Sequence, residues 1–240
     1  MGMPITIEVV DTISVKELDT IFEYFVDVDE RFSTYKDTSE MSRVNDGLDK
    51  IYWSKEMITV IELCEQTKNE TNGFFDIKHN GTLDPSGLVK GWAVYNAAKK
   101  LDAMGKRNYY VEAGGDIQVA GKNESGDDWT IGIRNPFNTT EIIKSITLSG
   151  KGVASSGTYI RGQHIYNPFQ SDQNIETIKS LTVIGPNVYE ADRYATACFA
   201  MGEKGINFVE NLPDFEGYMV DNTGIATFTS GFKNLTYAHV

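Results

Sequence analysis

The sequence has few of the residues that would assign it to several large classes of protein. It contains 2 cysteines and 3 histidines in 240 residues. Neither Cys64 nor Cys198 has the CxxC or Cys/His spacing of a zinc site. Each lies among apolar residues, so we interpret both as reduced core residues rather than as a disulfide. No stretch is apolar for long enough to cross a membrane.

Positive charge is also scarce, with 22 Lys and Arg against 34 Asp and Glu and a net charge of −12. This balance argues against nucleic acid or a membrane surface as the partner. The N-terminus lacks a basic region followed by a long apolar run, so no secretory signal is indicated and a cytoplasmic location is expected. An anionic ligand would need local cations, backbone amides or a metal.

The residues that are present predict an α+β fold, with largely antiparallel sheets flanked by helices. At 40% hydrophobic, residues 1–240 can bury a substantial core, either as one domain or as two fused lobes. The spacing of apolar residues predicts a strand followed by helices, and later short β-rich runs interrupted by one helix. The expected ranges are a strand at 5–10, helices at 15–32, 55–70, 88–105 and 189–203 (with an extension to 210 as an alternative), polar loops at 32–47 (with at most a short helix) and 73–87, and C-terminal strands at 215–221, 224–230 and 235–240.

The expected helix at 189–203 carries two polar residues on an alanine-rich wall. Asp192 and Thr196 are four apart and therefore project from nearly the same helix face. An acidic residue near a helix N-terminus is favourable by itself, which is a sufficient structural explanation. A carboxylate beside a hydroxyl also suits a hard cation such as Mg²⁺, but a metal site would need a third ligand.

Two glycine-containing segments allow a structural and a functional interpretation. In DPSGLVKGWAV, Lys90 follows a turn at a helix start, where amides and a lysine can hold phosphate, although the segment is not a Walker loop. Its glycines also fit close helix packing. In EAGGDIQVAG, Gly114 and Gly115 indicate a turn, or a close approach of backbone to a flat ring with Asp116 as an acceptor; no GxGxxG fingerprint is present.

Two further residues stand in polar stretches. His164 lies in VASSGTYIRGQHIYNP among hydroxyls and glycines, where a histidine can act as a general base or serve a structural role. No GxSxG elbow surrounds the serines there, so a serine hydrolase is not indicated. Tyr35, in the loop FSTYKDTSEMSRVN, can stack on a base or remain an exposed turn residue.

Taken in order, these segments resemble the ApbE-type FAD:protein FMN transferases, formerly called thiamine-biosynthesis lipoproteins. The resemblance spans nearly the whole chain, and five segments in the family's order make it specific. The segments are FSTYKDTSEMSRVN, FDIKHNGTLDPSGLVKGWAV, EAGGDIQVAG with WTIGIRNP, GVASSGTYIRGQHIYNP, and VIGPNVYEADRYATACFAMG.

The resemblance implies an ApbE-like or T-fold-like enzyme that binds FAD with Mg²⁺. Such a transferase moves FMN through a phosphoester bond to a threonine of an acceptor flavoprotein and releases AMP. Some members instead hydrolyse FAD to FMN and AMP, so a Mg²⁺-dependent FAD pyrophosphatase is one alternative. A non-catalytic flavin-binding module is another.

The resemblance also implies roles for single residues. Asp192, Thr196 and the carbonyl of Gly87 fall where the family has metal ligands. His164 matches the base for the acceptor threonine, and Tyr35 matches an aromatic near the adenine. The remaining matches lie near the flavin or the phosphates: Lys90, Gly114, Gly115 and Asp116.

The chain departs from the family pattern at two positions. The family often has HIIDP where this chain has HIYNP, so Asn167 replaces an acidic neighbour of the histidine. Tyr95 stands where many members have Asp. Typical members are also longer, with a lipid-anchored leader, and the compact form is expected to be intracellular.

Overall fold

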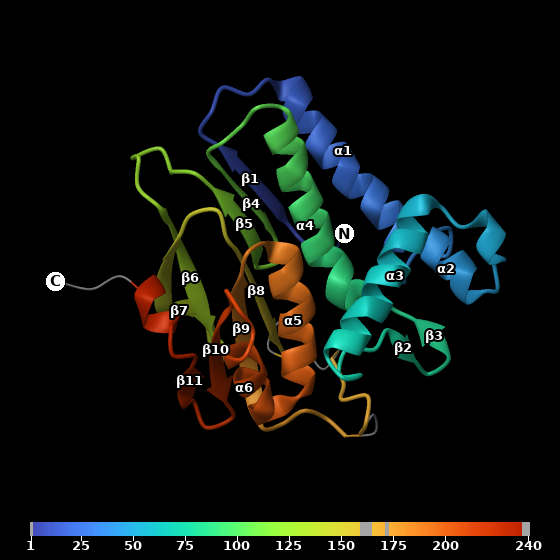
Figure 1. Cartoon of the computed structure of the whole chain (residues 1–240). Helices are drawn as coiled ribbons and strands as arrows, with labels where there is room; N and C mark the ends of the chain where they lie inside the picture. The colour runs from blue at the N-terminus through green and yellow to red at the C-terminus, as the bar shows by residue number, and fades with distance from the viewer. Residues whose placement is uncertain (1, 159–164, 171–172, 237–240) are drawn as a thin grey trace.

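The fold combines one large antiparallel sheet with a layer of helices (Figure 1). The structure is a computed structural model that describes residues 2–158, 165–170 and 173–236. The helices are α1 (Val15–Phe32), α2 (Glu40–Asn45), α3 (Lys55–Glu70), α4 (Ser86–Ala103), α5 (Val188–Ala200) and α6 (Gly205–Glu210), with short 3₁₀ helices at Lys50–Tyr52, Gly202–Lys204 and Phe232–Leu235. The strands are β1 (Ile5–Val9), β2 (Lys78–His79), β3 (Thr82–Leu83), β4 (Tyr109–Ala113), β5 (Asp116–Ala120), β6 (Trp129–Asn135), β7 (Asn138–Leu148), β8 (Gly152–Gly157), β9 (Ile178–Gly185), β10 (Glu216–Asp221) and β11 (Ala226–Phe228).

The large sheet has the strand order β1-β4-β5-β8-β9-β10-β11. Every neighbouring pair in it is antiparallel. The pairs β2–β3 and β6–β7 form separate antiparallel hairpins. The predicted α+β class with largely antiparallel sheets is therefore confirmed.

Alternation along the strands divides the core between the two faces of the sheet. On β9, Leu181 and Val183 pack with α5 and α6, whereas Ile184 belongs to the cluster under the β6–β7 hairpin. On β10, Met219 faces the helices, and Tyr218 packs with the hairpin. The sheet is thus covered by helices on one face and by the hairpin on the other.

Most of the expected elements form because local signals and burial agree. Ser14 caps α1: its Oγ accepts from the Glu17 amide at 3.3 Å, and its own amide donates to Glu17 Oε2 at 2.7 Å. The helix expected at 189–210 is divided into α5, a 3₁₀ turn and α6. The loop expected at 73–87 contains the short β2–β3 hairpin.

The predicted start of the last strand was wrong. Leu235, expected to begin a strand, ends a 3₁₀ helix, and Thr236 makes only an isolated bridge to Ile146. The 3₁₀ helix forms because Phe232 is drawn into the core beside Tyr218 and Phe228. Residues 237–240 lie outside the described part of the chain.

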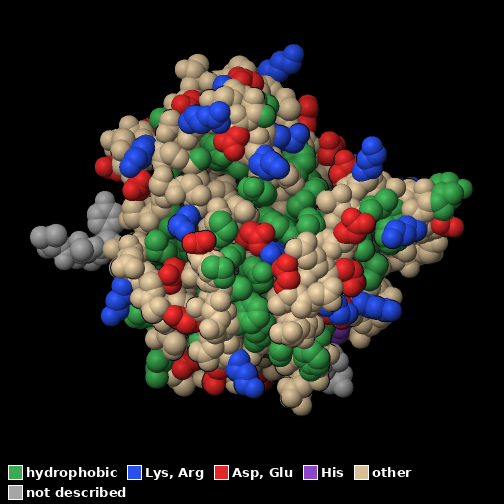
Figure 2. Space-filling view, in the orientation of Figure 1, with side chains coloured by type: hydrophobic (Ala, Val, Ile, Leu, Met, Phe, Trp, Pro, Cys, Tyr) green, Lys and Arg blue, Asp and Glu red, His purple; other side chains and the backbone are tan. Residues whose placement is uncertain are grey.

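The two cysteines are buried and free, as predicted. On the face drawn in Figure 2, acidic and basic side chains are interspersed, with hydrophobic side chains between them. None of the helices in the described ranges combines the length and the apolar character needed to cross a bilayer.

Candidate functional site

Helices α4 and α5 lie side by side (Figure 1), and two glycines of α4 set how closely they approach. A Cβ added at Gly91 would lie 2.5 Å from Asp192 Cβ, and one at Gly87 would lie 2.9 Å from Thr196 Cγ2. Because such distances are too short for carbon atoms, only glycine allows this contact. The sequence interpretation that these glycines permit close helix packing is confirmed.

The close approach brings two polar side chains of α5 against the backbone of α4. The Gly91 amide donates to Asp192 Oδ2 at 2.8 Å. The Thr196 hydroxyl donates to the Gly87 carbonyl oxygen at 3.1 Å. The carboxylate and the hydroxyl of α5 therefore lie beside a carbonyl of α4 that is more than a hundred residues earlier in the sequence.

Replacing Gly91 with alanine should destabilise the fold. Overpacking of this kind typically costs about 1–3 kcal/mol, because the added methyl would push Asp192 and α5 away. Urea unfolding of Gly91→Ala measures the loss. The control is Ala103→Gly, the reverse exchange at the exposed C-terminal end of the same helix, which should cost less than the roughly 0.5–1 kcal/mol of glycine in the middle of a helix. A Gly91→Ala protein as stable as the parent would mean that the two helices tolerate the methyl.

The position of α5 is fixed at its N-terminus. Asn187 caps the helix, its Oδ1 accepting from the Glu190 amide at 3.0 Å. Gln118 on β5 accepts from the Val188 amide at 2.8 Å. A Cβ at Gly152 would lie 1.9 Å from the Val188 amide nitrogen, so β8 passes directly beneath the start of the helix.

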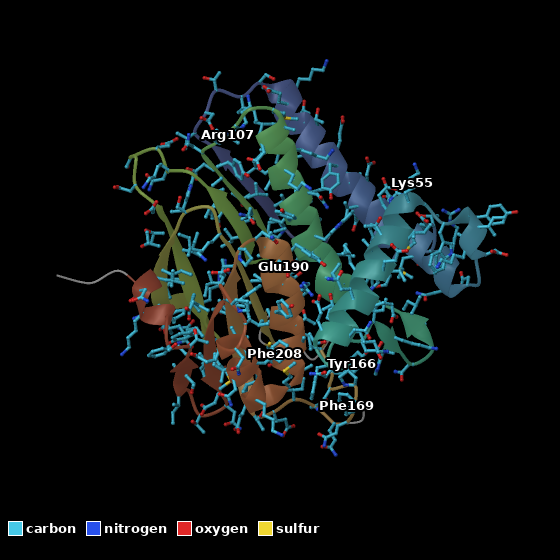
Figure 3. All side chains as sticks on the ribbon, in the orientation of Figure 1. Lys55, Arg107, Tyr166, Phe169, Glu190 and Phe208 are labelled. Atoms are coloured by element: carbon cyan, nitrogen blue, oxygen red, sulfur yellow. The ribbon has the colours of Figure 1, made fainter. Side chains whose placement is uncertain are left out.

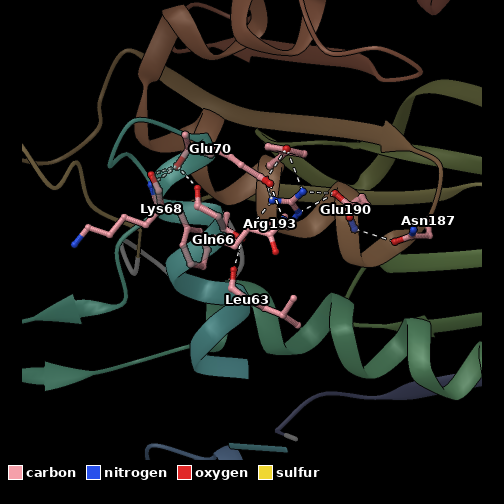
Figure 4. A network of polar contacts seen from close by, with 11 residues as sticks. Leu63, Gln66, Lys68, Glu70, Asn187, Glu190 and Arg193 are labelled. Atoms are coloured by element: carbon pink, nitrogen blue, oxygen red, sulfur yellow. Dashed lines mark hydrogen bonds and ion pairs between the residues drawn. The ribbon is translucent and has the colours of Figure 1, made fainter. Parts of the chain in front are cut away.

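A buried arginine holds the middle of α5 against α3 (Figure 4). Arg193 is 4% exposed, pairs with Glu190 at 2.5 Å and pairs with Glu70 of α3. Its guanidinium also lies over the Tyr194 ring, 4.2 Å from the centroid. These contacts restrain rotation of α5 and so keep Asp192 facing α4.

Three buried charged groups form a cluster beneath the α4–α5 contact. Lys90 Nζ lies 2.8 Å from Asp116 Oδ1 and 3.9 Å from Asp192 Oδ1. Asp116 is fully buried, and Asp192 and Lys90 are 3% and 7% exposed. Burial and the nearby Asp192 raise the pKa of Asp116 well above its ordinary value, while the Lys90 ammonium opposes that rise.

The turn between β4 and β5 consists of Gly114 and Gly115, with φ of +58° and +93°. Both values are positive, as in a type I′ hairpin turn, which glycine adopts without strain. The predicted turn is confirmed. It places Asp116 as the first residue of β5.

The cluster lies where two cavities meet. The first has a volume of about 420 Å³ and the second about 560 Å³, each within the range of small-molecule sites. Lys90, Gly114 and Ser155 line both cavities. Gly87, Asp192 and Thr196 line only the first, and Gly115 lines only the second. An elongated ligand with two parts would fit this arrangement.

The first cavity is also lined by aromatic and titratable side chains that the sequence did not single out. Tyr166 lies below α3 (Figure 3), and its ring is 4.1 Å from that of His79 on the β2–β3 hairpin. The Tyr166 hydroxyl donates to the Asp76 carbonyl at 2.7 Å. Burial raises the pKa of Tyr166 to about 12, so its phenol stays protonated.

The second cavity is lined by one face of β6 and by the chain's first residues. Thr130, Gly132 and Arg134, which line the cavity together with part of Ile131, alternate with the buried Trp129, Ile131 and Ile133. That alternation was a usable signal in the sequence. The lining residues at the N-terminal end are Gly2, Met3 and Pro4; no pattern in the sequence indicated them.

Three predicted site residues are not placed in these cavities. Asp116 is fully buried and lines neither of them. Tyr35 is 95% exposed and also lines neither. His164 lies outside the described residues. The roles of all three remain predictions.

The oxygen atoms of Asp192, Thr196 and Gly87 fit a hard cation. They are a carboxylate, a hydroxyl and a carbonyl, the oxygen ligands that Mg²⁺ accepts when water or phosphate completes its shell. Within the described ranges, no three His, Cys, Asp or Glu side chains gather into a further metal site. The Gly91 amide donates to Asp192 Oδ2, and Asp192 Oδ1 lies 3.9 Å from Lys90 Nζ.

Comparison with known proteins gives a consistent picture. The sequence model of the ApbE family matches residues 1–82 and 78–219. A relative from Haemophilus influenzae, named FAD:protein FMN transferase, is 34% identical over 167 residues, which is 64% of this chain and 48% of that protein. A Chlamydia muridarum protein of the same name is 28% identical over 244 residues, 76% of this chain and 74% of that protein. The chain thus spans about half the length of the Haemophilus relative.

Solved structures share the fold. The flavin transferase ApbE from Vibrio cholerae superposes with a TM-score of 0.85 over 98% of this chain and 96% of its own, at 24% identity. The ApbE protein from Thermotoga maritima gives 0.86 over 99% and 97%, at 21% identity. At these identities the likeness establishes the fold.

Proposed function

Since the chain belongs to the ApbE family, we propose that it is a Mg²⁺-dependent FAD:protein FMN transferase. It would take FAD as its substrate and move the FMN half to a threonine of an acceptor flavoprotein, releasing AMP. The observation that carries the proposal is the gathering of Asp192, Thr196 and the Gly87 carbonyl in the wall of a cavity that continues into a second one.

The shape of the site suits a dinucleotide. FAD has a flavin half and an adenosine half joined by a diphosphate. Two cavities that share Lys90, Gly114 and Ser155 can take one half each. The diphosphate would then cross the shared wall, beside the buried carboxylates of the α4–α5 cluster and the Lys90 ammonium. In this acidic chain, Lys90 is a local cation of the kind that an anionic ligand requires.

In the proposed reaction, Asp192, Thr196 and the Gly87 carbonyl would hold Mg²⁺. When bound, the ion would supply positive charge that offsets the charge of the diphosphate and of the leaving AMP. His164 withdraws the proton of the acceptor threonine hydroxyl. The threonine oxygen bonds to the phosphorus of the FMN half while the bond from that phosphorus to the bridging oxygen breaks, and AMP leaves with the oxygen. The walls of the cavities keep these groups aligned.

The test is incubation of the purified protein with FAD, Mg²⁺ and a threonine-containing acceptor. We expect acid-stable flavin fluorescence on the acceptor band and one AMP for each flavin transferred. Free FMN with unlabelled acceptor would identify a pyrophosphatase instead. Intact FAD after long incubation would identify a flavin-binding module without activity.

The proposal treats residues 1–240 as one flavin transferase domain that acts in the cytoplasm. The buried, free cysteines support a reducing compartment. Fractionation of cells that produce the protein tests the location: recovery outside the cytoplasmic fraction would contradict it.

A further inference from the structure

We propose that Asp116 is a positioning residue, which holds the Lys90 ammonium and thereby prevents it from neutralising Asp192. Asp116 would not touch the metal; it would keep the neighbouring carboxylate available for one. The inference rests on the proposed function in one respect, because it takes Asp192 as the carboxylate that binds a divalent cation.

The geometry of the cluster is asymmetric. Lys90 lies between two buried carboxylates, and its nitrogen is 2.8 Å from Asp116 Oδ1 but 3.9 Å from Asp192 Oδ1. The first distance is that of a close ion pair, and the second is at the outer limit of one. Lys90 is therefore paired more closely with Asp116, although Asp192 lies close enough to attract it.

The backbone gives each carboxylate a different environment. The Gly91 amide holds Asp192 Oδ2 at 2.8 Å, which leaves Oδ1 as the oxygen nearest to Lys90 and free of that amide. Asp116 follows the Gly114–Gly115 turn and shares a strand face with Gln118, whose side chain reaches the start of α5. Strand alternation thus directs Asp116 toward the helices.

The Lys90 ammonium and a divalent cation would compete for Asp192 Oδ1, because both are positively charged. One ammonium can fully compensate one of two buried carboxylates, and an ammonium bound at Asp192 Oδ1 would occupy the oxygen that a cation needs. Like charges in a poorly screened site repel strongly, so Lys90 and a divalent ion cannot both sit on that oxygen. With Lys90 held by Asp116, the remaining negative charge stays on Asp192.

Replacing Asp116 with asparagine should weaken metal binding. The side chain keeps its size and loses its charge, so Lys90 would turn toward Asp192. We expect the affinity for Mn²⁺, a spectroscopic substitute for Mg²⁺, to fall by about tenfold or more. Asp116→Leu, which removes the acceptor oxygen as well, should weaken it at least as much. The double variant Asp116→Asn with Lys90→Met removes the competing ammonium, and its affinity should return to within about threefold of the parent.

The experiment is a titration of each protein with Mn²⁺, in which electron paramagnetic resonance reads the free ion. No nucleotide is added, so the proposed contact of Lys90 with the diphosphate of FAD does not enter the measured affinity. Thermal unfolding of each variant checks that it folds. Weak binding in Asp116→Asn that the second substitution restores supports the inference, because a packing defect would not be repaired by removing a lysine.

Three outcomes would overturn the inference that Asp116 positions Lys90. Equal affinity in Asp116→Asn and the parent would mean that Asp116 does not control Lys90. Equal weakening in the single and double variants would assign the loss to packing. If the parent itself does not bind Mn²⁺, the metal assignment in the proposed function fails and this inference fails with it. The FMN transfer assay reads the proposed activity separately.

Discussion

Replacing Asp192 with asparagine is expected to slow FMN transfer by about 10²–10³-fold. The amide keeps the size of the side chain and an oxygen that can accept from the Gly91 amide. It removes the negative charge proposed to hold Mg²⁺. Metal stabilisation of a phosphoryl transition state is worth several kcal/mol, and each 1.36 kcal/mol is tenfold in rate. The measurement is the rate of AMP release as a function of Mg²⁺ concentration.

A matched control is Glu190→Gln, which removes a carboxylate from the same helix. Glu190 pairs with Arg193 and does not line either cavity. We expect this control to lower the unfolding temperature while leaving the Mg²⁺ dependence of AMP release near that of the parent. Asp192→Ala should behave like Asp192→Asn in rate. Unchanged turnover in both Asp192 variants would remove the metal from this position.

Replacing His164 with alanine is expected to reduce the rate of transfer by about 10²–10⁴-fold, the usual contribution of a general base. The affinity for FAD should change much less, because the proposed role is to withdraw the proton of the acceptor threonine. Single-turnover transfer and FAD binding by fluorescence are measured on the same preparation. Equal losses in both would contradict the role of base.

The natural control is a second histidine of the chain. His79 lines the first cavity on the β2–β3 hairpin. His79→Ala should alter the rate only a few-fold, since its ring packs on Tyr166. If His79→Ala instead gave the larger loss, the base would have to be reassigned to His79.

Much of the fold was predictable because its signals are local. The capping box of Ser14 and Glu17, the apolar spacing in α3 and the paired glycines at 114–115 each act over a few residues. The predicted start of a strand at Leu235 was wrong for the opposite reason. There, burial of Phe232 against Tyr218, a contact with a distant strand, decides the local structure.

The candidate site was predictable only in part. The sequence places Asp192 and Thr196 on one helix face, but the partners of these side chains, Gly91 and Gly87, come from α4 about a hundred residues earlier. The ion pair of Lys90 with Asp116 likewise depends on the packing of α4 against β5. Such long-range contacts leave no periodic trace, so they emerged from the resemblance to a family or from the structure.

The residues at 2–4 have a practical consequence for anyone who produces this protein. They line the second cavity, and Met3 packs so closely that a Cβ at Gly114 would lie 2.7 Å from its sulfur. A change in these residues would therefore alter the wall of that cavity directly. Preparations should be checked for intact residues 2–4 before ligand uptake is compared between variants, because losses caused by trimming there would be mistaken for losses caused by the substitution.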